Sequence, residues 1–286
     1  SYLENDWYKM PVALCRAASG EPVTVQVDLA GEKASAWVWE VRVGRTPLYL
    51  LDANISANPP QLREITGSLY GGDRENRIRQ EILLGVGGVR AIRALGLQPA
   101  VWHMNEGHVA MLTLERVREL MRRKGVSFEE AAQAVWPTSI FTTHTPVPAG
   151  NERFPPELMA RYFRRFAGEL GLSWKDFLAL GRENPDNEQE SFCMTVLALR
   201  LSACANGVSQ LHGRTSRRMW NGLWPGLPAE EVPIRAITNG VHPRTWISHD
   251  MIDLLDRYLG PRFQEEPTNA EVWDRIDKVS DEELFR

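Results

Sequence analysis

The stretch that decides the fold is Trp102-His103-Met104-Asn105-Glu106-Gly107-His108, taken together with Thr142-Thr143-His144-Thr145-Pro146-Val147-Pro148 further along the chain. In each stretch, a short apolar run ends where polar and ionisable side chains begin, and the two runs are Ala100 to His103 and Ser139 to Thr143. Such runs are typical of strands in open α/β sheets, where ligands bind outside the carboxyl ends of the strands. Two neighbouring strand ends of this kind predict one shared site.

The spacing of apolar residues around these strands predicts an α/β fold. We expect strands at 99–103 and 139–143, and helices at 107–123, at 127–135 with a Ser127/Glu130 capping box, and at about 156–170. Before them, residues 20–52 alternate apolar and polar side chains, as in an antiparallel meander. The sequence therefore predicts a βαβ-type parallel sheet with an antiparallel insertion near the N-terminus.

Patterns elsewhere predict further elements. They are a helix from Arg74 to Leu95, a buried helix at 192–205 ended by an Asn206-Gly207 cap, a short strand at Val208-Ser209, a helix from Gly213 to Trp220, a strand from Ile234 to Thr238, and a turn from Asn239 to Pro243. Residues 54–67 are expected to form a loop. Because the sequence has no internal repeat and no low-complexity linker, we expect one compact domain over residues 1–286.

The composition indicates a globular chain. Of its 286 residues, 43% are hydrophobic and 24% are charged, which is enough apolar content for a sizeable core. The net charge of -4, without a long run of like charges, gives no sign of a nucleic-acid footprint. No apolar run has the length that spans a bilayer, and the sequence from Ser1 has no signal-peptide pattern. These features predict a soluble, cytoplasmic protein.

The three cysteines are expected to be reduced thiols. Cys193 and Cys204 lie eleven residues apart in one predicted helix. At the rise of an α-helix they would be about 16 Å apart, which is too far for a disulfide. Cys15 stands alone in a polar region, and no Cys-x-x-Cys occurs. We therefore expect none of the three to be catalytic.

Common catalytic and cofactor patterns do not fit. Gly85-Val86-Gly87-Gly88 lies inside a helical pattern rather than after a strand, so we interpret its glycines as positions of tight helix packing. His103 and His108 lack the spacing and the third ligand of a metal site, and no Gly-x-Ser-x-Gly elbow occurs.

What remains is a polar edge of neutral donors and acceptors with one carboxylate: Asn105, Glu106, His108, His144, Asn206 and Asn239. Such an edge suits a polyhydroxylated ligand, and one or two of the ten tryptophans could stack on sugar rings.

Six longer motifs then occur in order along the chain. They are Leu69–Glu75, Arg77–Glu81, His103–His108, Phe141–Phe154, Asn206–His212 and Thr238–Trp246. Together they strongly resemble the α-glucan phosphorylases, and more closely the bacterial and archaeal branch of maltodextrin and glycogen phosphorylases. Long motifs in order over almost the whole chain make this resemblance far more specific than any single motif.

The resemblance implies part of the N-terminal, glucan-binding lobe of a glycosyltransferase with two Rossmann-like lobes, the glycosyltransferase-B architecture. Such an enzyme transfers a terminal α-1,4-glucosyl unit from a glucan or maltodextrin to inorganic phosphate and gives glucose 1-phosphate. Its cofactor, pyridoxal phosphate, would be held mainly by a C-terminal lobe, and the full-length enzyme can form a homo-oligomer. No nucleic acid, membrane or metal is implied.

The resemblance also implies roles for individual residues. By position, Asn239 would hydrogen-bond the glucosyl 6-hydroxyl, with the backbone of Val208 close by. The main-chain carbonyl of His144, the catalytic residue of this segment, would face the reacting anomeric region. Such an oxygen stabilises the positive charge that develops on the anomeric carbon.

Four more residues are expected to bind substrate. Glu106 and His108 would line the pocket beside the catalytic centre, and Asp73 and Arg74 would lie on a gating loop before the long helix. The chain departs from the animal enzymes at Ala149-Gly150, where they carry a Glu, and its gating loop is shorter. Effector control of the animal kind is therefore not expected.

The family's cofactor lysine motif, Gly-Thr-Gly-Asn-Met-Lys, and its early glycine-rich loop do not occur. The sequence also lacks an initial Met, and Ser280 and Glu283 open a helix just before the last residue. We therefore expect an internal piece of a longer enzyme, and no phosphorolysis by residues 1–286 alone. Two alternatives stay open: a lobe of a nucleotide-sugar glucan synthase and a non-catalytic glucan-binding fragment.

Overall fold

The computed structural model describes residues 9–68 and 72–285. The chain divides into two compact units, residues 1–238 and residues 239–286. The expectation of one compact domain is wrong, because the second unit packs around a small core of its own, formed by Leu255, Phe263 and Val272. The boundary between Thr238 and Asn239 could not be predicted from composition, because no Gly-, Ser- or Pro-rich linker marks it.

The centre of the first unit is a four-stranded parallel sheet in the order β10-β9-β6-β5. Its strands are β5 (Trp102–Asn105), β6 (Ser139–Thr143), β9 (Cys204–Gly207) and β10 (Ile234–Ala236). Met104 and Phe141 are completely buried. The predicted α/β class is confirmed, with β6 at its predicted bounds and β5 three residues later than expected at its start.

The chain after β5 also forms α-helices of the first unit. They are α4 (Met111–Lys124), α5 (Phe128–Val135), α6 (Pro156–Glu169), α7 (Trp174–Ala179), α8 (Met194–Arg200) and α9 (Gln210–Met219). The capping box at α5 is present, with the Ser127 side chain bonded to the Glu130 N–H and the Glu130 side chain bonded back. None of the described helices is long and apolar enough to cross a bilayer.

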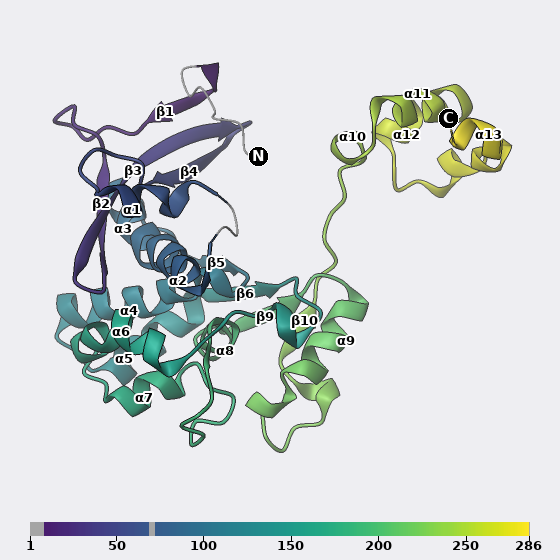
Figure 1. Cartoon of the computed structure of the whole chain (residues 1–286). Coiled ribbons are helices and arrows are strands. Elements are labelled where there is room, and N and C mark those ends of the chain that lie inside the picture. The colour runs from purple at the N-terminus through teal and green to yellow at the C-terminus, as the bar shows by residue number, and fades with distance from the viewer. Residues whose placement is uncertain (1–8, 69–71, 286) are drawn as a thin grey trace. The chain divides into compact units, whose positions relative to one another are not determined.

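An antiparallel sheet precedes this layer. It consists of β1 (Val12–Leu14), β2 (Thr24–Leu29), β3 (Glu32–Val43) and β4 (Thr46–Asp52). In β2 every second residue is buried, namely Val25, Val27 and Leu29, so that one face meets the protein interior. In Figure 1, α2 and α3 lie between this sheet and helices α4 to α7.

The predicted helix from Arg74 to Leu95 is interrupted in its middle. It consists of α2 (Arg74–Ile82), a π-helical segment (Leu83–Gly87) and α3 (Gly88–Ala94). A Cβ on Gly85 would lie 2.9 Å from the Cβ of Met111, so this glycine permits close packing on α4. Gly88 has no atom within 4 Å of such a Cβ, so the packing interpretation is right for Gly85 and wrong for Gly88.

The region from 192 to 209 differs most from the prediction. A strand β8 (Phe192–Cys193), which pairs with β7 (Arg153–Phe154), is followed by α8 and then by β9, where one buried helix was expected. An apolar run of this kind cannot be divided between helix and strand by its periodicity. Cys193 and Cys204 therefore lie in different strands, which removes the helical distance argument, and all three cysteines are free thiols.

The predicted strand at Val208-Ser209 is also wrong, because Ser209 is the N-cap of α9 and accepts the His212 N–H at 3.0 Å. That helix begins three residues before the predicted Gly213. Within the expected loop, the chain forms the short helical turns α1 (Pro60–Arg63) and Glu64–Thr66.

The second unit is helical. It contains α10 (Pro243–Trp246), α11 (His249–Leu259), α12 (Arg262–Glu265) and α13 (Asp281–Leu284). Pro243 occupies the first turn of α10, where a missing N–H has no cost. Ser280 caps α13 by accepting the Glu283 N–H.

Gly85→Ala should lower the free energy of unfolding by about 1–3 kcal/mol, because the added methyl group has no room beside Met111. The matched control is Gly88→Ala in the same helix, which should be neutral or stabilise by up to about 1 kcal/mol. Urea unfolding of both variants measures the difference. Equal destabilisation by the two substitutions would contradict this account of the π-helical segment.

Candidate functional site

The carboxyl ends of β5 and β6 lie side by side. Asn105 pairs with Thr142 in the parallel register, and the Glu106 N–H donates to the Thr142 carbonyl oxygen at 2.9 Å. The residues that follow each strand therefore meet at one edge of the sheet. We call this edge the carboxyl edge and define it by Asn105, Glu106, His144 and Val208.

The carboxylate of Glu106 holds the segment after β6. Its Oε1 accepts a short hydrogen bond from the His144 N–H and a second from the Thr145 hydroxyl at 3.1 Å. The His144 ring Nε2 lies 2.7 Å from the Asn105 Oδ1. Asn105, the last residue of β5, and Glu106, which follows it, thus fix the ring and the backbone of His144.

The backbone at Glu106 bends sharply. Its φ of 68° lies in the left-handed region that non-glycine residues rarely adopt. The next residue must be glycine-sized, because a Cβ on Gly107 would lie 3.0 Å from the backbone nitrogen of Thr195. Backbone strain of this kind persists only where surrounding contacts enforce it, and here it turns the carboxylate toward β6.

A chain of side chains ties three strands together just inside the edge. The Thr142 hydroxyl donates to the Asn206 Oδ1 at 2.8 Å, and the His103 Nε2 lies 2.7 Å from the same hydroxyl. Since the hydroxyl has one hydrogen, it accepts from His103, whose Nε2 then carries the proton. Asn206 was expected at the edge, whereas Thr142 was not predicted to have a role.

His108 belongs to a second, partly buried cluster. Its Nδ1 lies 3.6 Å from the Glu81 Oε1 and 3.4 Å from the Arg77 Nη2. The Arg77 Nε donates to the Glu152 Oε1 at 3.0 Å. Burial of Glu81 raises the pKa of its carboxyl above the ordinary value.

This cluster of Arg77, Glu81, His108 and Glu152 links α2 to the loop that follows His144. Sequence reasoning missed three of its members. The signal for Glu81 was present, because it falls between Ile78 and Ile82 on the apolar face of the helix, where a charged residue is unusual.

Val208 lies beside the end of β6, because Gly207 of β9 pairs with Thr143. The Val208 N–H donates to the Nδ1 of the buried His212 at 3.2 Å. A Cβ on Gly207 would lie 2.8 Å from that same nitrogen, so only glycine allows α9 to start so close to the strand.

The remaining predicted residues lie in other places. Asp73 caps α2 by accepting the Asn76 N–H at 2.9 Å, and the exposed Arg74 lines a shallow pocket together with residues 148–153. Asn239 is the exposed first residue of the second unit. The start of the gating-loop motif, residues 69–71, lies outside the described residues. The structure thus brings together Glu106, His144 and Val208, with His108 in the neighbouring cluster.

Comparison with known proteins gives consistent matches. The sequence model of the carbohydrate phosphorylase family matches residues 89–286. A maltodextrin phosphorylase from Thermococcus litoralis is 41% identical over 97% of this chain and 32% of its own length. Glycogen phosphorylases from Mycobacterium tuberculosis and Aquifex aeolicus are 44% and 36% identical over 100% and 99% of this chain, and 34% and 40% of their own lengths. The chain thus spans about a third of the first two relatives.

Glu106→Ala should lower the free energy of unfolding by about 1–3 kcal/mol, because it leaves the N–H of His144 and the hydroxyl of Thr145 without their acceptor. Glu106→Gln keeps an oxygen at the same position and should lose less. Urea unfolding of the two variants provides the comparison. An alanine variant as stable as the wild type would show that the carboxylate does not hold this edge.

Proposed function

The chain belongs to the carbohydrate phosphorylase family, and we propose that its carboxyl edge forms the glucosyl-binding part of an α-glucan phosphorylase. In this proposal the full-length protein acts in the cytoplasm. It transfers a terminal α-1,4-linked glucosyl unit from a glucan or maltodextrin to inorganic phosphate and releases glucose 1-phosphate. The relatives named above are glycogen and maltodextrin phosphorylases.

The observation that carries the proposal is the hydrogen bond from the His144 N–H to the Glu106 carboxylate. That hydrogen bond fixes the peptide between Thr143 and His144. The next peptide, which carries the His144 carbonyl, is held by the Thr145 N–H, which donates to the Thr143 hydroxyl at 3.3 Å. Within the described residues, no donor hydrogen-bonds the His144 carbonyl oxygen, so this oxygen is available to a ligand. Cleavage of a glycosidic bond builds positive charge on the anomeric carbon, and a preorganised carbonyl oxygen beside it lowers the energy of that state.

The other groups at the edge suit a sugar. Asn105 and the His144 ring are exposed polar groups that can exchange hydrogen bonds with hydroxyls, and the Val208 backbone lies beside them. A site built from such donors discriminates against ligands that leave them unpaired. Asn239 is proposed to bind the glucosyl 6-hydroxyl, and Asp73 and Arg74 are proposed to lie along the path by which substrate enters.

The implied cofactor does not fit the residues of this edge. Pyridoxal phosphate is held by a lysine imine, and the lysines of the first unit lie in other elements: Lys9 before β1, Lys33 in β3, Lys124 at the end of α4 and Lys175 in α7. We propose that a C-terminal lobe supplies this group. The parallel sheet of the first unit would then be the Rossmann-like part of a glycosyltransferase-B architecture.

The proposal is tested with the full-length protein that contains this chain. Incubated with pyridoxal phosphate, maltodextrin and inorganic phosphate, it should release glucose 1-phosphate, whereas residues 1–286 alone should release none and form no borohydride-sensitive imine. The parallel assay offers a nucleotide sugar as glucosyl donor. Glucosyl transfer from the nucleotide sugar without phosphorolysis would reject the phosphorylase assignment in favour of a synthase. If the protein shows neither phosphorolysis nor glucosyl transfer from the nucleotide sugar but still binds glucan, it is a non-catalytic glucan-binding protein.

In the full-length enzyme, Asn239→Ala should lower kcat/KM for maltodextrin by about 5- to 150-fold, the factor that corresponds to one buried hydrogen bond to substrate, about 1–3 kcal/mol. The matched control is Asn187→Ala, an exposed amide in the loop between α7 and β8 of the first unit. Steady-state kinetics give both values. Turnover within twofold of the wild type by a folded Asn239→Ala variant would remove this residue from the site.

A further inference from the structure

A cavity of about 320 Å³ lies in the first unit, bounded by β2, β3, α2, the π-helical segment, α3, α4 and α6. Its wall contains five basic side chains, and these are Lys33, Arg90, Arg118, Arg122 and Arg165. Two acidic side chains, Asp28 and Glu169, share the wall with them. The cavity has no residue in common with the carboxyl edge.

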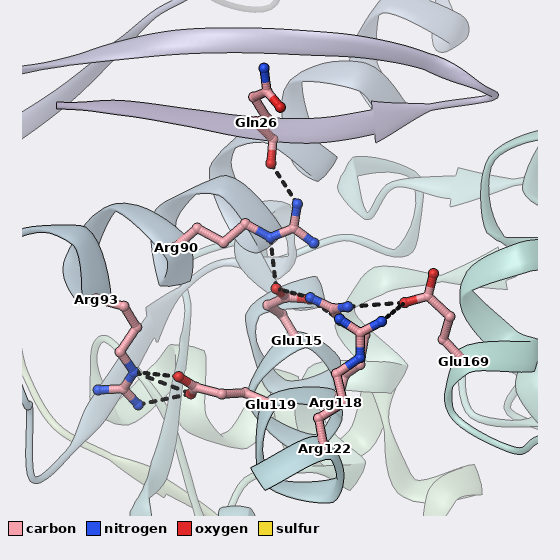
Figure 2. Close-up of polar contacts among 8 residues, drawn as sticks. All are labelled: Gln26, Arg90, Arg93, Glu115, Arg118, Glu119, Arg122 and Glu169. Carbon is pink, nitrogen blue, oxygen red and sulfur yellow. Dashed lines mark hydrogen bonds and ion pairs between the residues drawn. The ribbon is translucent and has the colours of Figure 1, made fainter. Parts of the chain in front are cut away.

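Two carboxylates hold the inner guanidinium groups in place. The buried Glu115 accepts from the Arg90 Nε at 2.8 Å and from the Arg118 Nη2 at 2.7 Å. Glu169 accepts from the Arg118 Nη1 at 2.9 Å. Figure 2 shows these side chains converging from α3, α4 and α6, with Arg90 also donating to the backbone of Gln26. These two carboxylates balance the charge of the two inner guanidinium groups and fix their positions.

The cations nearer the solvent are held more loosely. The Arg122 Nη2 lies 3.6 Å from Glu169. Arg165 lies 3.3 Å from Asp28 through its Nη1 and 3.5 Å from Glu169 through its Nε. Both side chains are mostly exposed, at 65% and 78%. Lys33 is exposed and makes no ion pair with the described residues. These three groups can therefore turn toward a ligand at little cost.

The charges of the cavity do not balance. Five cations face Asp28, Glu169 and the underlying Glu115, which leaves an excess of two positive charges. The inner pair of Arg118 and Glu115 is only 11% and 3% exposed, so water screens this part of the field weakly. A doubly charged anion with several acceptor oxygens complements both the excess charge and the geometry of the guanidinium groups.

We propose that this cavity binds a phosphoryl group, as the dianion of inorganic phosphate or of a phosphate monoester. In this proposal the fixed guanidinium groups of Arg90 and Arg118 bind the anion from the inner side of the cavity. The exposed side chains of Lys33, Arg122 and Arg165 bind it from the solvent side. The proposal is independent of the proposed phosphorolysis, because the cavity and the carboxyl edge share no residue.

The test measures binding of inorganic phosphate and of methyl phosphate to the full chain by isothermal titration calorimetry, at constant ionic strength and with chloride as the reference anion. The double variant Lys33→Gln/Arg122→Gln removes two exposed cations and should weaken phosphate binding about tenfold. Lys124→Gln is the matched control, because Lys124 is exposed on the same helix as Arg122 but does not line the cavity. Urea unfolding verifies that all variants fold.

The two anions separate the sources of the ligand. Equal affinity would indicate a site for the phosphoryl group itself, and tighter binding of methyl phosphate would indicate a monoester site. Either result supports the proposal when the double variant loses affinity and Lys124→Gln does not. Equal losses in both variants would show nonspecific attraction and overturn it, as would absence of binding by the wild type. Loss of phosphate binding in Glu106→Ala, with the double variant unaffected, would place the anion at the carboxyl edge and reject this cavity.

Discussion

The hydrogen bond from the His144 N–H to the Glu106 carboxylate is the contact on which the carboxyl edge depends. It joins the residues that follow two adjacent parallel strands, and it does so from a backbone conformation that glutamate rarely adopts. The Gly107 position, close against Thr195, lets the chain make that bend. A stable α/β scaffold therefore carries a strained turn at the point where a ligand would bind.

Much of the fold could be predicted because the relevant signals are local. The β6 strand is a short apolar run with a clear end, and α5 begins at a capping box whose two hydrogen bonds involve neighbouring residues. Residues 192–207 were mispredicted because most of their side chains are buried, so no period distinguishes strand from helix. The boundary after Thr238 was missed because it depends on which residues share a core, and no change in composition marks it.

The candidate site could be predicted only in part, for a related reason. Strand ends identified Glu106 and His144 as neighbours, since parallel strands meet at one edge. The partners of His108 could not be found in this way, because Arg77, Glu81 and Glu152 come from a distant helix and loop that tertiary packing brings together. Among residues 9–68 and 72–285, no side-chain contact defines a role for the exposed Asn239, and its assignment depends on the family motif.

The π-helical segment at Leu83–Gly87 has a consequence for how the length of this chain can vary. A π-turn contains one residue more than an α-turn, so the segment accommodates one extra residue within the long helix. Glu81 before the segment faces His108, and Arg90 after it faces Glu115. Removal of one residue within the segment would leave a regular α-helix with both side chains on their present faces. Removal of a residue elsewhere between them would rotate one face against the other by about 100°. The long helix thus has one place where a deletion can be accommodated, and it lies where Gly85 already packs on α4.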